Sequence, residues 1–237
     1  MTVFKKLIVA GSILATTAQA ASIVRFFELT TDPKEKASYN QVGVENLTTS
    51  IKNEKGTLAM YTSHKSDNPS INYVVEIYES DEAYQVHANS PQFKKFVEVA
   101  KTAVKSRKVF ETNPQFLAEK KEPLYIEKAN KQKVILAEVL VSADKNEEFK
   151  KHVLEELKQA MEKEKDILLA YAVTLKDEPN KWYFFEVYKN NEAFLEHRNS
   201  DYIKKYTENT KDMVLSRNIM ELKGDTLVNK GGLYLEF

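Results

Sequence analysis

The feature that most constrains the fold of this chain is an internal repeat. The 24 residues from Tyr73 to Phe96 (YVVEIYESDEAYQVHANSPQFKKF) recur 110 positions later, from Tyr183 to Tyr206 (YFFEVYKNNEAFLEHRNSDYIKKY), with ten identities. Unrelated segments share about one or two such positions at ordinary residue frequencies. A long internal period indicates a duplicated structural unit. The chain is therefore predicted to hold two copies of one domain, residues 21–128 and 129–237.

Residues 1–20 have the pattern of a cleaved signal peptide. Lys5 and Lys6 precede a short apolar core, and Ala18-Gln19-Ala20 forms a small-x-small cleavage site. The apolar run is too short to span a bilayer. The chain has no cysteine, which excludes disulfides, thiolate metal sites and a lipid-anchored lipoprotein. We expect a protein that is periplasmic or secreted and has no membrane span.

Charge and composition narrow the class of partner. The chain balances 35 basic against 35 acidic residues, so no basic field exists to attract nucleic acid. A hydrophobic content of 42% with few glycines and prolines is typical of an ordered globular protein. The four histidines stand at positions 64, 87, 152 and 197, with no closely spaced ligand pair, so no metal site is predicted.

Each copy has the pattern strand, helix, strand, strand, helix, strand. Expected strands are residues 23–29, 57–63, 72–78 and 107–111 in the first copy, and 134–141, 167–175, 182–188 and 217–222 in the second. Asp32-Pro33 is a helix-start signal, and Ser90 and Ser200 are N-cap candidates for the second helix of each copy. This order predicts an α+β fold of two ferredoxin-like βαββαβ repeats, each an antiparallel four-stranded sheet with helices on one face.

A sheet with helices on one face leaves its other face uncovered. The two copies are therefore expected to pack sheet to sheet within one chain. A monomer is the simplest solution state, with a dimer of chains as the alternative. Strands at 124–127 and 233–236 are expected to reach the other copy's sheet edge, with 113–121 and 129–133 as connecting segments.

The third strand of each copy has two different faces, because side chains alternate along a strand. Tyr73, Val75 and Ile77 form an apolar face, which we expect to pack against the helices. The opposite face carries Glu76 and Tyr78, repeated in the second copy. We expect this face to border a pocket between the two sheets.

The repeated block also resembles a known family. The pattern Glu76-x-Tyr78-x-x-x-x-Ala83-x-x-x-His87-x-x-Ser90-Pro91-x-Phe93 is similar to the antibiotic biosynthesis monooxygenase (ABM) domain, with quinol monooxygenase-like proteins as nearest relatives. The resemblance covers essentially all of the chain after residue 20, once per copy. It implies a dimeric α/β barrel, normally built from two subunits and here intramolecular, with a pocket between sheet and helices. Several members oxidise quinols, anthrones or similar polyphenols with O₂, which implies that no cofactor is needed.

A polyphenol becomes reactive toward O₂ once it is deprotonated, so the resemblance implies a base and groups that position the ring. Histidine suits the role of base because its ordinary pKa lies near neutrality. The candidate catalytic residues are His87, His197, Glu76 and Glu186. The candidate substrate-binding residues are Tyr61, Tyr171, Tyr78, Tyr188 and Trp182. The structural alternatives are a histidine bonded to a backbone carbonyl, a glutamate paired with a lysine across the sheet, and a tryptophan in the core.

The two pockets are expected to be unequal. Asn72 in the first copy corresponds to Trp182 in the second, and Val74 corresponds to Phe184. We expect an aromatic ligand to contact Trp182 in preference to Asn72; the alternative is that the larger side chains fill the second pocket. Three functions stay open: an exported cofactor-independent monooxygenase acting on a quinol-like molecule, a non-catalytic binder of a small hydrophobic ligand, and a structural or stress-related exported domain.

Overall fold

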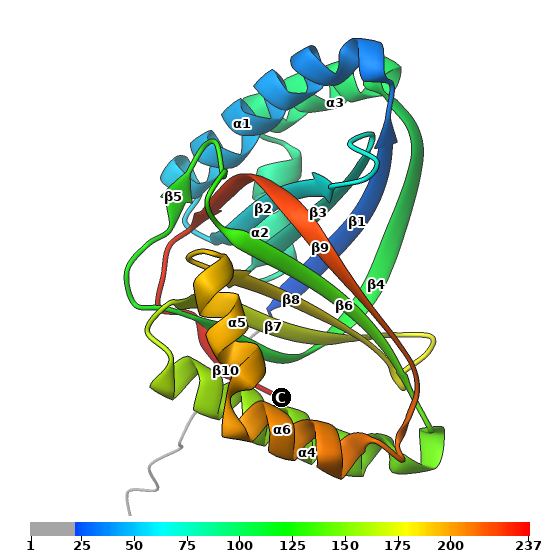
Figure 1. The fold of residues 1–237 in the computed structure, drawn as a ribbon. Helices are drawn as coiled ribbons and strands as arrows, with labels where there is room; N and C mark the ends of the chain where they lie inside the picture. Colours follow the sequence, from blue (N-terminus) through cyan, green and yellow to red (C-terminus); the bar gives the residue numbers. More distant parts are fainter. Residues whose placement is uncertain (1–21) are drawn as a thin grey trace, which may run out of the picture.

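The computed structural model describes residues 22–237, so the predicted signal peptide lies outside the described residues. Both copies follow the predicted element order, with one further short helix in each before the second long helix (Figure 1). The first copy contains β1 (Ile23–Thr31), α1 (Lys36–Asn53), β2 (Thr57–Lys65), β3 (Ile71–Tyr78), α2 (Asp81–Ala88), α3 (Pro91–Ala103), β4 (Val104–Glu119) and β5 (Tyr125–Ile126). The second contains β6 (Lys133–Val141), α4 (Asn146–Lys163), β7 (Ile167–Leu175), β8 (Lys181–Tyr188), α5 (Asn191–Asn199), α6 (Asp201–Thr210), β9 (Val214–Asn229) and β10 (Tyr234–Glu236).

The predicted helix starts are confirmed by their capping bonds. The Asp32 carboxylate accepts from the backbone N–H of Lys34 at 2.9 Å, and a short 3₁₀ turn, Pro33–Glu35, leads into α1. The Ser90 hydroxyl accepts from the N–H of Phe93, and Ser200 caps α6 in the same way. Each cap satisfies a backbone donor that the first helical turn leaves without a partner.

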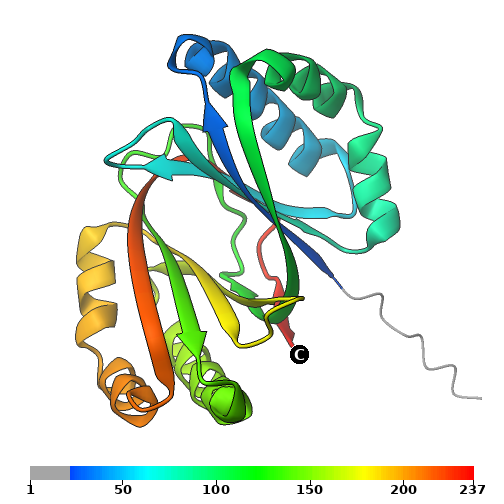
Figure 2. The same cartoon turned by 90° about the vertical axis from the view of Figure 1, so that its right-hand side faces the viewer.

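Eight of the described strands close into an antiparallel barrel, in the order β1-β3-β2-β9-β6-β8-β7-β4 with β4 returning to β1. The helices of the two copies lie on opposite outer sides of these strands (Figure 2). The predicted sheet-to-sheet packing of the copies within one chain is therefore confirmed. Its two seams are the β2–β9 and β4–β7 ladders.

Two long strands build these seams. β4 pairs with β1 through its first half and with β7 of the second copy through its second half, and β9 joins β6 to β2 in the same manner. The expectation that residues 113–121 form a connecting segment was wrong, because 113–119 continue β4. This stretch forms a strand because it pairs with β7 of the other copy, and the local sequence does not reveal such a distant partner.

The short terminal strands cross between the copies as predicted. β5 of the first copy pairs with β9, and β10 of the second copy pairs with β4. Each copy therefore adds a strand to the other, which covers strand edges that would otherwise be exposed.

The assignment of the two faces of β3 was wrong. Tyr73, Val75 and Ile77 lie inside the barrel, in one buried cluster with their counterparts Tyr183, Phe185 and Val187. Glu76 and Tyr78 lie on the outer face, under the helices. The apolar and aromatic face of β3 joins the barrel interior, while the outer face keeps the Glu76 carboxylate bonded to the Tyr78 hydroxyl, because a buried carboxylate needs a polar partner.

Candidate functional site

The first copy contains a cavity of about 1100 Å³ between its sheet and its helices. Its walls come from β1, β2 and β3, from α1, α2 and α3, and from the start of β4. Residues 127–130 after β5 and residues 223–226 of β9 complete the wall, so both copies contribute. The apolar lining includes Phe27, Leu29, Leu47, Val74, Phe93 and Phe96. A largely apolar cavity with a few polar groups is typical of a small-molecule site.

Small residues keep this cavity open. A Cβ atom added to Gly43 on α1 would meet no heavy atom within 4 Å, so this glycine faces open space. The corresponding residue of the second copy is Val153, which is buried. Trp182 and Phe184 likewise stand where the first copy has Asn72 and Val74. These larger side chains occupy the corresponding space in a close-packed interior.

Trp182 does not offer a stacking surface to a ligand, contrary to our expectation. It is fully buried, stacked on Phe184 with ring centroids 5.9 Å apart, and in edge contact with Phe149. Its indole N–H donates to the Asn146 side chain at 2.8 Å. The protein therefore buries the whole ring and occupies its one donor, which favours the alternative that larger side chains fill the second pocket.

Glu76 is placed on the wall of the cavity. Its side chain is 7% exposed, and one carboxylate oxygen accepts from the Tyr78 hydroxyl at 2.9 Å. Burial raises the pKa of Glu76, while His87, the Tyr78 hydrogen bond and Arg25 oppose the shift in part. The second copy repeats the contact, with Tyr188 donating to Glu186 at 2.7 Å. The predicted carboxyl–phenol pairs are therefore present, and the one in the first copy borders the cavity.

The two repeated histidines tie helices together. His87 is fully buried, and its Nδ1 lies 3.1 Å from the carboxylate of Glu54, which caps the end of α1. His197 makes the equivalent contact with Glu164 at 2.8 Å. Burial lowers the pKa of His197, but the bond to Glu164 and the nearby carboxylates outweigh it and raise the pKa overall. His87 is not among the residues that line the cavity. This geometry favours a structural role with a carboxylate partner instead of a backbone carbonyl.

Asn46 of α1 supplies a free acceptor at the cavity. The residue is 2% exposed and lines the cavity, and its Oδ1 has no hydrogen-bond partner among the described residues. Buried polar atoms are normally satisfied, so an unpartnered one at a cavity wall indicates a place for a ligand or water. The second copy has Glu156 at this position, and its Oε1 also lacks a hydrogen-bond partner among the described residues. It lies 3.9 Å from Nε2 of His197.

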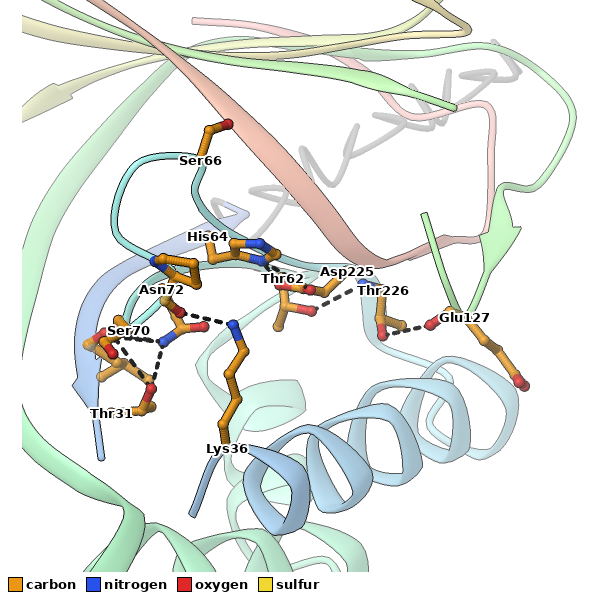
Figure 3. Close-up of polar contacts among 12 residues, drawn as sticks. Thr31, Lys36, Thr62, His64, Ser66, Ser70, Asn72, Glu127, Asp225 and Thr226 are labelled. Carbon is orange, nitrogen blue, oxygen red and sulfur yellow. Dashed lines mark hydrogen bonds and ion pairs between the residues drawn. The ribbon is translucent and has the colours of Figure 1, made fainter. Parts of the chain in front are cut away.

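A histidine–aspartate pair lines the same cavity and was missed by sequence reasoning. Nδ1 of His64, on β2, lies 2.9 and 3.0 Å from the two carboxylate oxygens of Asp225, on β9 (Figure 3). Next to it, the Thr62 hydroxyl accepts from the N–H of Thr226 at 3.1 Å. His64 has no histidine counterpart in the repeat, and Asp225 lies 161 residues away. The one indication of this pair in the sequence was that strands of the two copies had to lie side by side where the copies meet.

Tyr61 and Tyr171 lie inside the barrel and not at the cavity. Their hydroxyls are 2.8 Å apart, on the axis that relates the two copies, and both donate to Glu119. The repeat counterpart of Glu119 is Asn229, which donates to the Tyr61 oxygen at 2.9 Å. Both tyrosines are buried in the central core. Their geometry serves the contact between the copies.

Glu119 is expected to make stability depend on pH. Burial raises its pKa to about 7, against the opposing effect of the two tyrosine hydrogen bonds. Between pH ~4.5 and ~7 the folded chain then holds a proton that the unfolded chain has released. The free energy of unfolding should fall across this range as pH rises, by up to about 3 kcal/mol from this group. Glu119→Gln should remove that contribution. Urea unfolding of both proteins at pH 5 and pH 8 measures it, and parallel changes in the two would contradict this assignment.

Two structural features are absent from residues 22–237. No helix in this range is long and apolar enough to cross a membrane. The same range contains no group of three or more His, Cys, Asp or Glu side chains placed to hold a metal ion.

Comparisons with known proteins agree with this architecture. The sequence profile described as "Antibiotic biosynthesis monooxygenase" matches twice, at residues 22–99 and 134–209. A "putative monooxygenase" from Lactobacillus acidophilus NCFM has a similar structure, with TM-score 0.86, 28% identity, and coverage of 91% of this chain and 100% of the other. A second, from Fusobacterium nucleatum, has TM-score 0.84 and 25% identity, and covers 92% and 99%. An anthrone oxidase-like protein at 12% identity and TM-score 0.52, covering 92% and 97%, shares the fold. No curated protein sequence matches this chain.

The fold and the two matches define a class of protein, an intramolecular α/β barrel made of two homologous halves. The chain belongs to the antibiotic biosynthesis monooxygenase family, as a tandem member with both domains in one polypeptide.

Proposed function

We propose that this protein is a cofactor-independent monooxygenase that oxidises a quinol-like or polyphenolic small molecule with O₂ in the cavity of the first copy. The single observation that carries the proposal is the cavity itself, apolar on most of its surface and bordered by the buried carboxyl group of Glu76. Its aromatic side chains suit the flat face of a phenolic ring. Family membership and the similarity to monooxygenases at 25–28% identity support the reaction class.

In this reaction the protein needs only to bind the substrate and to accept its protons. A phenolic hydroxyl that loses its proton becomes electron-rich enough to react with O₂ without a metal or flavin. Because burial raises the pKa of Glu76, its carboxyl group is suited to exchange a proton nearer neutrality than an ordinary glutamate. Asn46 can accept a hydrogen bond from a second hydroxyl group. Glu186, His87 and His197 stay candidates only as supporting groups under this proposal.

We also propose that the protein works outside the cytoplasm, in the periplasm or as a secreted protein. The support is the signal-peptide pattern of residues 1–20. Mass spectrometry of the mature N-terminus from cell fractions tests this directly. A chain that retains Met1 and Lys5 in the cytoplasmic fraction would contradict it.

Glu76→Gln should lower quinol turnover about 100-fold, because general acid–base groups contribute on the order of 10²–10⁴. The variant keeps the side-chain volume and can still accept from Tyr78, so the fold should survive. Oxygen uptake with a panel of quinols measures the effect, and Glu186→Gln is the matched control in the second copy. Equal losses from the two variants would mean that the cavity is not the site.

Non-catalytic binding of a small hydrophobic molecule is the alternative function. The apolar walls of the cavity serve binding as well as catalysis. A ligand that binds the folded chain raises its melting temperature. A thermal shift with quinols and no oxygen uptake above the buffer rate would favour this alternative.

A further inference from the structure

A β-bulge is duplicated at the two seams of the barrel. In the β2–β9 ladder, Tyr61 pairs with Leu227 and Ser63 with Gly224, so the long strand carries one extra residue, Asp225. The β4–β7 ladder shifts at the corresponding point, where the extra residue is Gln115. A bulge re-aims the side chain of its extra residue and is common next to active sites.

The two bulges carry different chemistry. At the first seam the bulged residue Asp225 holds Nδ1 of His64. At the second seam the corresponding pair is Gln115 and Thr174, joined by a neutral amide–hydroxyl bond of 3.3 Å. Both seams therefore have the same backbone bulge, but only the β2–β9 seam carries a pair of ionisable side chains there.

The titratable pair is on the side of the open cavity. His64 and Asp225 both line it, with side chains 18% and 27% exposed, so a small molecule can reach them. Because Nδ1 donates to the carboxylate, the neutral ring carries its lone pair on Nε2. In residues 22–237 the hydrogen bonds of this ring run through Nδ1 alone.

We propose that His64, oriented by Asp225 of the second copy, is a proton acceptor for a hydroxyl group of the aromatic ligand. The Nε2 lone pair takes the proton, and the electron pair of the O–H bond stays on oxygen as a phenolate. Asp225 stabilises the imidazolium that forms. No electron is transferred in this step. Asp225 is thus a positioning residue, and the second copy, whose own pocket is filled, completes the site of the first.

This inference rests on the proposed function and supplies the proton transfer that this reaction needs. Monooxygenation of a quinol by O₂ places one oxygen atom on the ring, giving a hydroxyquinone, and reduces the other to water. The two protons of that water come from the substrate, so groups at the cavity must accept them from the ring and pass them to the reduced oxygen. Glu76 pairs with Met60 in the β2–β3 ladder and His64 pairs with Asn72. The two acceptors therefore lie four residues apart along one face, ~13 Å at the usual rise of a strand. They stand toward opposite ends of the sheet wall of the cavity.

Anaerobic binding of 4-nitrophenol tests proton transfer without oxidation, since only its phenolate absorbs visible light strongly. In the presence of saturating protein, half-ionisation of the phenol should occur about one pH unit lower with the natural chain than with His64→Gln, a tenfold change in acid constant. Asp225→Asn should give a smaller change in the same direction. Other charged groups also line this cavity, namely Glu76, Lys101, Arg107, Glu127, Lys128 and Lys223. Comparing variants cancels their contribution.

Thr174→Val and Gln115→Leu are the matched controls and should leave the ionisation unchanged, with thermal melts confirming that all variants fold. Identical ionisation with the natural chain and His64→Gln, or no binding of 4-nitrophenol, overturns the inference. Oxygen uptake with quinols that persists unaltered in His64→Gln also overturns it while leaving the proposed function standing. A shifted ionisation without oxygen uptake supports the His64–Asp225 pair and refutes the monooxygenase.

Discussion

Filling the cavity of the first copy is expected to abolish both ligand binding and quinol turnover. The double substitution Gly43→Val and Val74→Phe introduces the residues that the second copy has at the same positions, Val153 and Phe184. A side chain at position 43 meets open space, so the new atoms enter the cavity instead of the protein core. Valine also removes a helix-interior glycine, which helps stability by a few tenths of a kcal/mol.

The expected loss is at least about 100-fold in affinity, since even a single methylene in a tight pocket changes selectivity by ~10–200-fold. Calorimetric titration with quinols and oxygen uptake measure it, while urea unfolding should show a fold as stable as before. Phe184→Val is the reciprocal control, because it changes the same residue types in the copy whose pocket is filled. Full turnover by the double variant would place the site elsewhere in the molecule.

Replacing Trp182 by alanine is expected to lower the free energy of unfolding by about 3–5 kcal/mol, the usual cost of removing a large buried aromatic side chain. The substitution leaves a void between Phe149 and Phe184 and deprives Asn146 of its indole donor. For a chain of this size the melting temperature should drop by about 10 °C. Quinol turnover per folded molecule should stay the same below the transition.

Asn72→Ala is the matched substitution in the first copy. The Asn72 amide donates to Leu29 and Ser70 carbonyls and to the Thr31 hydroxyl, so alanine there costs hydrogen bonds but little packing. Because Asn72 also lines the cavity, this change should alter quinol affinity, whereas Trp182→Ala should not. Loss of turnover from Trp182→Ala in fully folded protein would instead place the active site in the second copy.

The proposed function would divide stability and ligand binding between the two copies. Under the helices of the second copy one continuous buried cluster includes Phe149, Leu157 and Trp182. The first copy has two small clusters there, and the cavity lies among their residues. A domain with an open cavity is less stable than one in which side chains fill the same space. A duplicated domain can carry that cost in one half while the other half stays fully packed, which agrees with a general trade-off between stability and function.

The sequence by itself determined the duplication, the element order and the helix caps, because these depend on local patterns. The identities from Tyr73 to Phe96 fixed the repeat, and Asp32, Ser90 and Ser200 marked helix starts through bonds to residues two or three positions away. It also placed Glu76 next to a phenol, since Tyr78 follows two residues later on the same strand face.

Only the tertiary structure decided which face of each sheet turns inward, which pocket stays open, and which residues meet across a seam. Alternation along β3 defines two faces but not their partners. The apolar face joined the barrel interior, and the outer face left Glu76 bonded to the Tyr78 hydroxyl. The Val-to-Phe and Asn-to-Trp differences predicted unequal pockets. Whether the larger side chains line a pocket or fill it depends on the helix that packs against them, which carries Gly43 in the first copy and Val153 in the second. His64 and Asp225 come together only because β9 crosses from one copy to the other, a pairing that no local pattern encodes.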